Sequence, residues 1–557
     1  MKEEIRKLII CSIESISGRD ASIDVQVKFN IEIPKNKKFG DFSTNIAMVL
    51  SKSFEKSPRE IAELIIENLP LDSNEIIKKT EIAGPGFINF FVKEKSISSK
   101  LNQINDLDRE FGSSNLGNQK RVLLEYVSAN PTGILHLGHA RNAVVGGTLA
   151  NILSFAGYDV TKEFYINDTG RQIELLGLSV FSRYKELFGE ESEIPEDGYK
   201  GIYVIEIAEH LKNEVGDKLL NDSLDKAIDY CSDFAKAKMI DEIREDLKSI
   251  GVEFDSWFSE KNELYSVKEG DSLVDRVKKK LSDIGALEKK DGAVWFKSTS
   301  YGDSQDWVLI RKDGTPTYFL GDITYHYEKY ERGYKGGLIN IWGADHHSHV
   351  NRLKIAVKAL GFDETLLKVL LIQFVRLMSE GKEVSMSKRA GSYVTLREVA
   401  AEVGIDVMRY FLIMRSSDSH LDFDLDLAKK ESNENPVYYV QYAHARIGSV
   451  FENAKKVNIE ASNENLSLLN LNEEIEIIKK LLEFPEIVRD CALSFSPHKL
   501  AFYLQDIASL FHVYYNRVRI IGDDSDLTKT RLFLIKCIRI VIGNGLTLLG
   551  IASPDRM

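Results

Sequence analysis

The stretch from 121 to 139, RVLLEYVSANPTGILHLGH, decides the fold class of this 557-residue chain. Its first seven residues are short and mostly apolar, which predicts a central parallel strand covered on both faces. A polar loop follows, and a helix then runs to about Phe155, with Gly157 as its ending glycine. Residues 160–166 predict the next strand. Strand, helix and strand in this order form a βαβ unit, so we predict an α/β fold with a Rossmann-like parallel sheet.

The predicted helix begins with two histidines in the sequence His136-Leu-Gly-His139. A spacing of three places both imidazoles on one helix face. The free N–H groups and the positive dipole of a helix start suit an anion, and Gly138 would let a flat base approach the backbone. Ligands of such sheets bind at the strand ends, so we interpret this segment as a nucleotide triphosphate site. The alternative is that two surface histidines happen to begin a helix.

A second candidate segment, residues 379–392, is polar and basic, and Gly381 and Gly391 would let it move. Its Lys388 is a compact cation that could offset developing phosphate charge. The alternative is an exposed hairpin with ordinary surface lysines. The combination with the histidine pair, about 250 residues earlier, favours the functional interpretation.

The sequence predicts three domains. Residues 1–115 predict an α+β domain, with a helix over 2–17, an alternating strand over 23–27, a helix from 44 to about 54 and another helix beginning at Pro58. Residues 116–426 predict the α/β core, with further strands near 337–345 and 368–376 and an acidic helical insertion at about 180–300. Residues 427–557 predict an all-α helix bundle, from apolar-periodic runs at 437–451, 474–493, 499–518 and 529–549.

The formal net charge is −12, which taken alone counts against a nucleic-acid partner. However, residues 1–120 carry 18 basic and 18 acidic side chains, and residues 427–557 carry 16 of each. The deficit is concentrated at 186–246, with 7 basic and 18 acidic residues. A nucleic acid is therefore not excluded, but we expect it to avoid this insertion.

The remaining composition predicts a cytoplasmic protein. The four cysteines lie far apart and form no CxxC pair, which is typical of a reducing compartment and argues against disulfides and a cysteine-based zinc site. The charged N-terminus does not resemble a signal peptide. No uninterrupted apolar run is long enough to cross a bilayer, so we expect no membrane contact.

The histidine pair and the basic loop together resemble the HIGH and KMSKS signatures of class I aminoacyl-tRNA synthetases, and the closer match is the arginyl-tRNA synthetase family. Strings along most of the chain carry this resemblance: FGDFSTNIAM (39–48), GPGFIN (84–89), SANPTG (128–133), YINDTGRQ (165–172), YFLGD (318–322), GADHH (343–347), MSKRAG (386–391) and YVQYAHAR (439–446). One departure is Ser385, which replaces the first lysine of KMSKS, while Lys388 holds the second lysine position. Lys382 is a candidate to replace the missing charge.

The resemblance implies roles for particular residues. The implied catalytic residues are His136, His139 and Lys388. The implied ATP-binding residues are Gly138, Gly343, Asp345, Met386 and Ser387. The implied arginine-binding residues are Glu125, Asn130, Tyr318, Asp322 and His346. A guanidinium is planar, always charged and carries five donors, so carboxylates are the expected partners. The alternatives are that Tyr318 is a core residue and that Glu125 pairs with a lysine or arginine of the protein.

The run Asp345-His346-His347-Ser348-His349 also contains potential metal ligands. Adjacent side chains diverge on a strand or a helix, so three of them could hardly converge on one ion. We therefore expect no protein-bound structural metal, and Mg²⁺ is implied only as the companion of ATP.

The implied reaction has two steps. L-Arginine attacks the α-phosphate of ATP to give arginyl-adenylate and pyrophosphate, and the terminal ribose of tRNA-Arg then takes the arginyl group. The N-terminal domain would contact the tRNA elbow and the C-terminal domain the anticodon, with Tyr514, Arg517 and Arg519 as candidate RNA contacts, unless these aromatics are core residues. We expect a monomer. The rival interpretations are a nucleotidyltransferase for a smaller substrate and a non-catalytic tRNA-binding paralogue.

Overall fold

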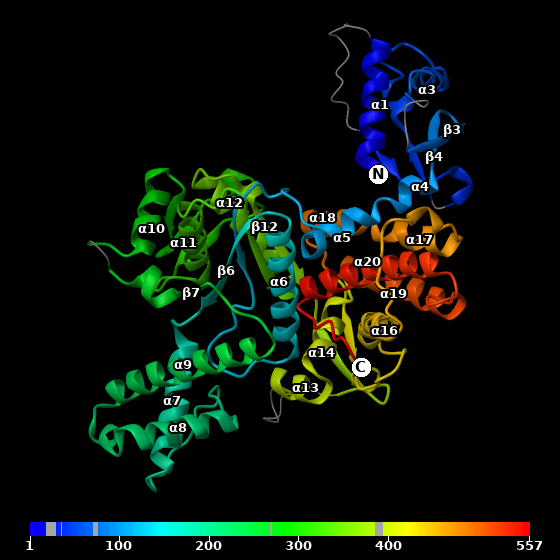
Figure 1. Cartoon of the computed structure of the whole chain (residues 1–557). Coiled ribbons are helices and arrows are strands. Elements are labelled where there is room, and N and C mark those ends of the chain that lie inside the picture. Colours follow the sequence, from blue (N-terminus) through cyan, green and yellow to red (C-terminus); the bar gives the residue numbers. More distant parts are fainter. Residues whose placement is uncertain (18–28, 35, 71–75, 268–269, 385–393) are drawn as a thin grey trace.

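The computed structural model describes residues 1–17, 29–34, 36–70, 76–267, 270–384 and 394–557. The strand predicted over 23–27 lies outside the described residues, as do Met386, Ser387 and Lys388. Figure 1 shows a central α/β body, a helical arm that projects from it, a group of C-terminal helices beside it and an N-terminal α+β unit at the far end of those helices.

The central sheet has five parallel strands in the order β12-β11-β5-β6-β7. The strands are β5 (Arg121–Glu125), β6 (Asp159–Ile166), β7 (Ser256–Ser259), β11 (Gly337–Gly343) and β12 (Leu367–Ile372). Helix α6 (Leu137–Phe155) connects β5 to β6, which confirms the predicted βαβ unit and the α/β fold. The strand order reverses between β5 and β11, so their carboxyl ends border the crevice where such sheets bind ligands.

Helix α6 is buried on nearly all sides because it lies between the sheet and the C-terminal helices. Gly146 allows the backbone of α6 to approach Tyr126 closely, since a Cβ at this position would lie 2.3 Å from the Tyr126 ring. Arg141 is fully buried on the same helix and donates to the backbone carbonyls of Gln373, Ser416 and Ser419. These three bonds fix the first turns of α6 against residues 232 to 278 positions away.

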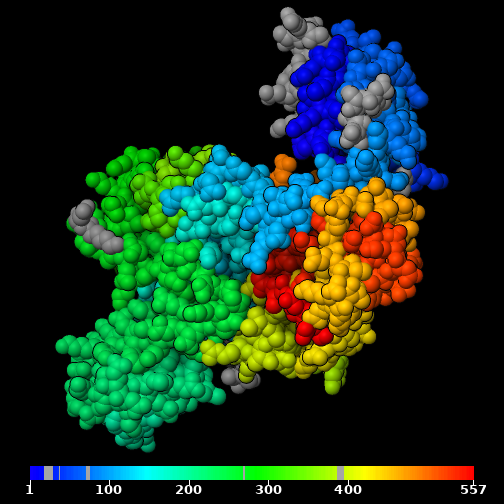
Figure 2. Space-filling view, viewed as in Figure 1, coloured from blue at the N-terminus to red at the C-terminus, as the bar shows by residue number. Residues whose placement is uncertain are grey.

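The acidic insertion is a helical arm made of α7 (Arg171–Glu186), α8 (Ile202–Val215) and α9 (Leu224–Ser249), which share their own hydrophobic core. Figure 2 shows it protruding from the main body. The prediction that helical structure continues to about residue 300 is wrong. Strand β7 rejoins the main sheet because Trp257 and Phe258 stack on Phe164 and Tyr165 of β6. Beyond it, helix α10 (Leu273–Asp283) precedes an antiparallel sheet of β8 (Leu287–Lys290), β9 (Ala293–Phe296) and β10 (Trp307–Ile310).

The N-terminal unit packs helices on a four-stranded sheet of order β1-β2-β4-β3. Its elements are α1 (Lys2–Ser17), β1 (Ile31–Glu32), β2 (Phe42–Thr44), α2 (Ile46–Leu50), α3 (Pro58–Glu67), β3 (Ile77–Ala83) and β4 (Phe87–Val92). Helix α3 begins at Pro58 as predicted, with a Ser57–Glu60 capping box. The helix predicted from residue 44 is shorter, because 42–44 pairs with β4. Helices α4 (Glu94–Ser98) and α5 (Leu101–Leu107) then lead to the C-terminal helices (Figure 1).

The C-terminal part is helical, as predicted. Its helices are α16 (Pro436–Lys456), α17 (Asn472–Leu481), α18 (Phe484–Ser494), α19 (His498–Arg517) and α20 (Ser525–Leu549). The single helix predicted over 474–493 is two helices, because Pro485 lies in the first turn of α18. By length and composition α20 could cross a membrane, but 72% of its most apolar window is buried inside the protein, where it forms the centre of this helical group.

A smaller three-stranded sheet joins the core to these helices. It contains β13 (Val375–Ser379), β14 (Lys382–Glu383) and β15 (Leu421–Asp424), and it is accompanied by α13 (Leu396–Val403), α14 (Ile405–Ile413) and α15 (Leu425–Ala428). Lys382 is exposed on β14, within the described part of the segment predicted as the basic loop.

Candidate active site

The two histidines at the start of α6 lie side by side, as the spacing predicts. Their ring centroids are 3.9 Å apart, with an interplanar angle of 28°. The backbone N–H of Gly138 donates to His136 Nδ1 (3.1 Å), and that of His136 donates to His139 Nδ1 (3.3 Å). Because each Nδ1 accepts a hydrogen bond, each neutral ring carries its proton on Nε2. The pair therefore has two Nε2–H donors at a helix start, which suits an oxyanion.

The chain that follows the predicted basic loop returns to this helix start. Thr395 forms an antiparallel bridge with His136, and the Leu396 N–H donates to the Leu135 carbonyl (2.9 Å). On the other side, the Val384 N–H donates to the Leu377 carbonyl (2.8 Å). The described residues that follow the predicted basic loop are therefore joined to the histidine motif at the start of α6.

Two of the residues predicted to contact ATP, Gly343 and Asp345, lie at the carboxyl end of β11. Gly343 ends this strand, and a Cβ there would lie 2.4 Å from Asp345 Oδ1, so only glycine allows this placement of the carboxylate. The side chains of Asp345 and His346 are exposed, and His346 Nε2 lies 3.6 Å from Asp345 Oδ2. Both side chains are thus accessible at the carboxyl end of β11.

Tyr318 and Asp322 occupy the first turns of α11 (Tyr318–Glu331), one turn apart as predicted. Tyr318 is 62% exposed, so it is not the core residue that we considered as an alternative. The Asp322 carboxylate lies 2.7 Å from His349 Nε2, on α12 (His347–Ala359). Arg352, one turn further along, donates to His349 Nδ1 (2.5 Å). His349 therefore contacts the Asp322 carboxylate directly, and Arg352 positions the His349 ring.

A second carboxylate, Glu260, lies beside Asp322 and was not predicted from the sequence. A Cβ on Gly321 would lie 3.3 Å from Glu260 Oε1, which places this buried carboxylate against the first turn of α11. Burial raises the pKa of Glu260 to about 7, and the negative charges of Asp322 and Asp168 contribute to this rise. Hydrogen bonds from Thr169 and Tyr165 oppose it. Two carboxylates in one partly buried recess are an environment that favours a cation.

The 165–172 string that carried part of the family resemblance supports this recess. Asp168 accepts from Ser259 Oγ and from the Lys261 N–H, both at 2.8 Å, and so fixes the backbone on either side of Glu260. Gln172 accepts from Asn130 Nδ2 at 2.7 Å, which orients the side chain predicted to hold the amino-acid head group. The string therefore acts mainly by positioning other residues.

The position of Glu125 does not support its predicted contact with arginine, because both of its carboxylate oxygens are bound within the protein. Glu125 is only 4% exposed at the end of β5. Its Oε2 accepts from Lys329 Nζ (2.5 Å) and its Oε1 from Ser128 Oγ (3.0 Å). The internal ion pair considered as the alternative is thus the observed arrangement, since neither oxygen lacks a partner.

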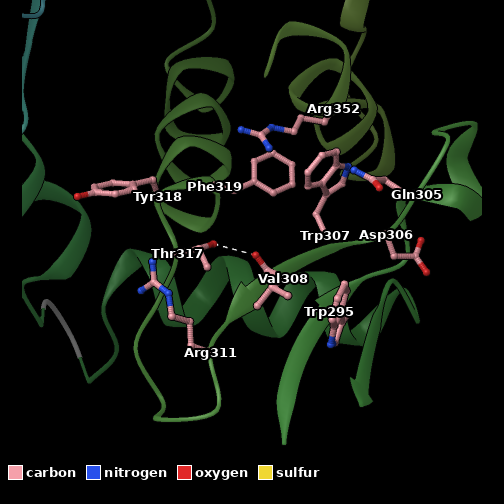
Figure 3. Close-up of a pocket in the computed structure, with 10 residues that line it drawn as sticks. All are labelled: Trp295, Gln305, Asp306, Trp307, Val308, Arg311, Thr317, Tyr318, Phe319 and Arg352. Atoms are coloured by element: carbon pink, nitrogen blue, oxygen red, sulfur yellow. Dashed lines mark hydrogen bonds between the residues drawn. The ribbon is translucent and has the colours of Figure 1, made fainter. Parts of the chain in front are cut away.

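A cavity of about 470 Å³ adjoins the start of α11. Figure 3 shows Arg352 beside Phe319 and Trp307, and the Arg352 guanidinium carbon lies 5.1 Å and 4.6 Å from these two ring centroids. Thr317 Oγ1 donates to the Val308 carbonyl (2.9 Å), which ties the first turn of α11 to β10. The aromatic wall therefore fixes Arg352, and through it His349 and Asp322.

The candidate RNA contacts of the C-terminal helices divide into two kinds. Tyr514 is fully buried and donates to Glu474 Oε1 (3.0 Å), so its prediction as an RNA contact is wrong. It lies three residues after the buried Phe511, on the face of α19 that packs in the core. Arg517 and Arg519 are accessible; Arg517 lies 3.6 Å from Glu473, and Arg519 Nε donates to the Ile521 carbonyl.

Within the residues that the structure describes, no three His, Cys, Asp or Glu side chains gather as a metal site would require. His349 of the 345–349 run faces Asp322, whereas His346 faces the solvent beside Asp345. His346 and His349 therefore have different surroundings.

The architecture and this site define the class of the protein. Residues 100–418 match the family described as "tRNA synthetases class I (R), catalytic domain". Residues 3–92 match "Arginyl tRNA synthetase N terminal domain", and residues 440–557 match "DALR anticodon binding domain". The parallel sheet with its paired histidines is thus the catalytic domain of a class I aminoacyl-tRNA synthetase.

Full-length relatives define the family. The chain is 44% identical to the arginine–tRNA ligase of Geobacter sp. (strain M21) over 561 residues, covering 100% of both proteins. It is 46% identical to that of Listeria monocytogenes serovar 1/2a over 529 residues, covering 95% of this chain and 94% of that protein. The fold matches a Thermus thermophilus arginyl-tRNA synthetase with a TM-score of 0.74, at 22% identity and with both chains fully covered. The chain belongs to the arginyl-tRNA synthetase family.

Proposed function

We propose that this protein is an arginine–tRNA ligase that activates L-arginine with ATP and transfers it to the 3′-terminal ribose of tRNA-Arg for protein synthesis. The observation that carries the proposal is the recess beside the nucleotide crevice, where Asp322 and the buried Glu260 lie together against the start of α11. A guanidinium is the amino-acid side chain whose charge and donors suit two carboxylates.

For the nucleotide, we propose that His136 and His139 donate their Nε2–H groups to the phosphates. Gly138 leaves room for the base or ribose, while Gly343 and Asp345 bind the adenosine. Lys388 neutralises the departing pyrophosphate, and Met386 and Ser387 of the same segment contact ATP, as the family resemblance implies. Mg²⁺ enters with ATP and supplies charge neutralisation at the phosphates.

For the amino acid, we propose that Asp322 and Glu260 accept from the guanidinium and that Tyr318 covers it. Asn130, oriented by Gln172, holds the head group, and His346 faces it from the end of β11. The attacking group is already a carboxylate anion, so the first step requires no protein base. Positioning and charge stabilisation therefore supply most of the catalysis.

For the tRNA, we propose that residues 1–115 contact the elbow and that residues 427–557 bind the anticodon, with Arg517 and Arg519 near the RNA. Residues 116–426 carry out both chemical steps. The acidic arm at 186–246 repels phosphates and lies away from the RNA. We further propose a cytoplasmic monomer; the four cysteines, three of them buried, are all unpaired.

Aminoacylation of total tRNA tests this function. The purified protein should attach radiolabelled arginine to tRNA only when ATP and Mg²⁺ are present, and it should release AMP and pyrophosphate. Failure to charge any tRNA at ample enzyme would reject the proposal. Turnover of a phosphorylated small molecule without RNA would instead favour the nucleotidyltransferase interpretation.

A further inference from the structure

A buried polar network on α11 supplies no group to the proposed reaction. Its centre is Lys329, whose ammonium is 0% exposed and lies one buried turn beyond His326. Lys329 Nζ donates to Glu125 Oε2 (2.5 Å) and to Asn340 Oδ1 (2.9 Å). Lys329 Nζ also lies over the Tyr325 ring, 4.1 Å from the ring centroid. Burying a charge this completely costs desolvation free energy unless its partners are well placed, so the Lys329 ammonium depends on the partners around it.

On one side the network leads to Asp322. The Asp322 carbonyl can only accept, so His326 Nδ1 donates to it across 2.8 Å. His326 Nε2 must then accept from Asn340 Nδ2 (2.7 Å), which turns Asn340 Oδ1 towards Lys329. Burial and the neighbouring Lys329 lower the pKa of His326, in agreement with a neutral ring. Every donor and acceptor from Lys329 to the Asp322 backbone therefore has one defined orientation.

On the other side the network leads to the loop that carries Asn130. Glu125 Oε1 accepts from Ser128 Oγ (3.0 Å), and Ser128 Oγ accepts from the Tyr165 N–H (3.2 Å). Val127 and Ser128 have φ values of +66° and +41°, a conformation that non-glycine residues rarely adopt. Such a turn persists only when its surroundings hold it, and the Glu125–Ser128 bond does so here.

We infer that Lys329 is a positioning residue that fixes the strand end leading to Asn130 relative to the helix carrying Tyr318 and Asp322. The inference rests on the proposed function, because Asn130 and Asp322 are proposed to hold opposite ends of the same arginine molecule. Glu125 then acts through Lys329 and Ser128, without touching the substrate. Loss of the network changes the distance between the two halves of the arginine site and leaves the ATP half intact.

Asn340→Leu tests this inference, because it keeps the side-chain size but breaks the link between Lys329 and His326. We expect the arginine KM to rise about tenfold or more, since displacements of about 1 Å have effects of this order. The ATP KM should stay within about twofold. Tyr325→Phe is the matched control: it keeps the ring that faces Lys329 and removes only an equally buried hydrogen bond on α11, from the Tyr325 hydroxyl to Glu163 (2.7 Å). It should leave both KM values within about twofold.

Folding is checked by the melting temperature of each variant. If Asn340→Leu does not fold, the double variant Glu125→Gln/Lys329→Met replaces it, because it removes both buried charges together. A folded variant with an unchanged arginine KM, or with equal rises for arginine and ATP, would overturn the inference. If Glu125 bound arginine directly, Glu125→Gln would raise the arginine KM while Asn340→Leu would not. Failure of the unmodified enzyme to charge arginine would instead reject the proposed function.

Discussion

Replacing Asp322 with asparagine removes one negative charge from the proposed guanidinium recess and changes almost nothing in shape. The carboxylate is held by His349 Nε2 at 2.7 Å, and its side chain is 33% exposed, so it can meet a ligand from the crevice. A hydrogen bond to a charged group is worth about 1.5–3 kcal/mol. Since about 1.4 kcal/mol corresponds to a factor of ten, the arginine KM should rise roughly 10- to 150-fold. Solvent screens part of this charge, so we expect the lower half of that range.

The assay is steady-state aminoacylation with saturating tRNA, in which the KM for arginine and the KM for ATP are measured separately. The ATP KM should remain near its normal value, because Asp322 lies on α11 and the proposed ATP contacts lie on α6 and at the end of β11. Asp363→Asn is the matched control, as it makes the same chemical change at an exposed position where asparagine also caps well. Equal rises in both KM values for Asp322→Asn, or no rise for arginine, would refute the assignment.

Three further predictions follow from the site and the helices around it. Because the pKa of Glu260 is raised to about 7, this residue is neutral below that pH and ionised above it, so kcat/KM for arginine should increase as pH rises through about 7. Glu260→Gln should flatten this rise. An unchanged pH profile in that variant would exclude Glu260 as a contact of the guanidinium. In Gly138→Ala the new Cβ would lie 2.9 Å from His136 Cε1, so the histidine ring must move. The rate of adenylate formation should fall, while the melting temperature changes little. A normal rate would mean that His136 does not contact the phosphates. Tyr514→Phe removes the hydroxyl bond to the buried Glu474 carboxylate and should lower the free energy of unfolding by about 1.5–3 kcal/mol, measured by urea denaturation, without changing the KM for tRNA. A raised tRNA KM at unchanged stability would instead identify Tyr514 as an RNA contact.

The sequence was sufficient for the core of the fold because its signals are local there. The apolar run at 121–127, the polar loop and Gly157 predicted a βαβ unit that the structure confirms over β5, α6 and β6. The break at Pro485 also has a local signal, since proline favours the first turn of a helix over its interior. The return of β7 to the main sheet had no such signal, because it depends on aromatic stacking across strands far apart in the sequence.

The site was predicted less completely for the same reason. Glu260 lies in a segment without a recognisable motif, and only folding brings it against Gly321 and Asp322. Glu125 was misassigned because its position at a strand end suits a ligand contact, whereas its partner Lys329 is 204 residues away. Tyr514 was misassigned because alternating aromatic and basic residues look alike on a buried face and on an RNA-binding face. In each case the pattern identified a residue type, and tertiary contacts decided its role.

We propose that this site selects the charged guanidinium of arginine and that the enzyme attaches this amino acid to tRNA. Charging of total tRNA with arginine, compared with citrulline and lysine under identical conditions, tests it most directly. Citrulline has the shape of arginine without its charge, and lysine has the charge without the planar fork. We predict efficient charging with arginine and essentially none with either analogue. Comparable charging with citrulline would contradict the proposed carboxylate recess, and absence of arginine charging would contradict the function itself.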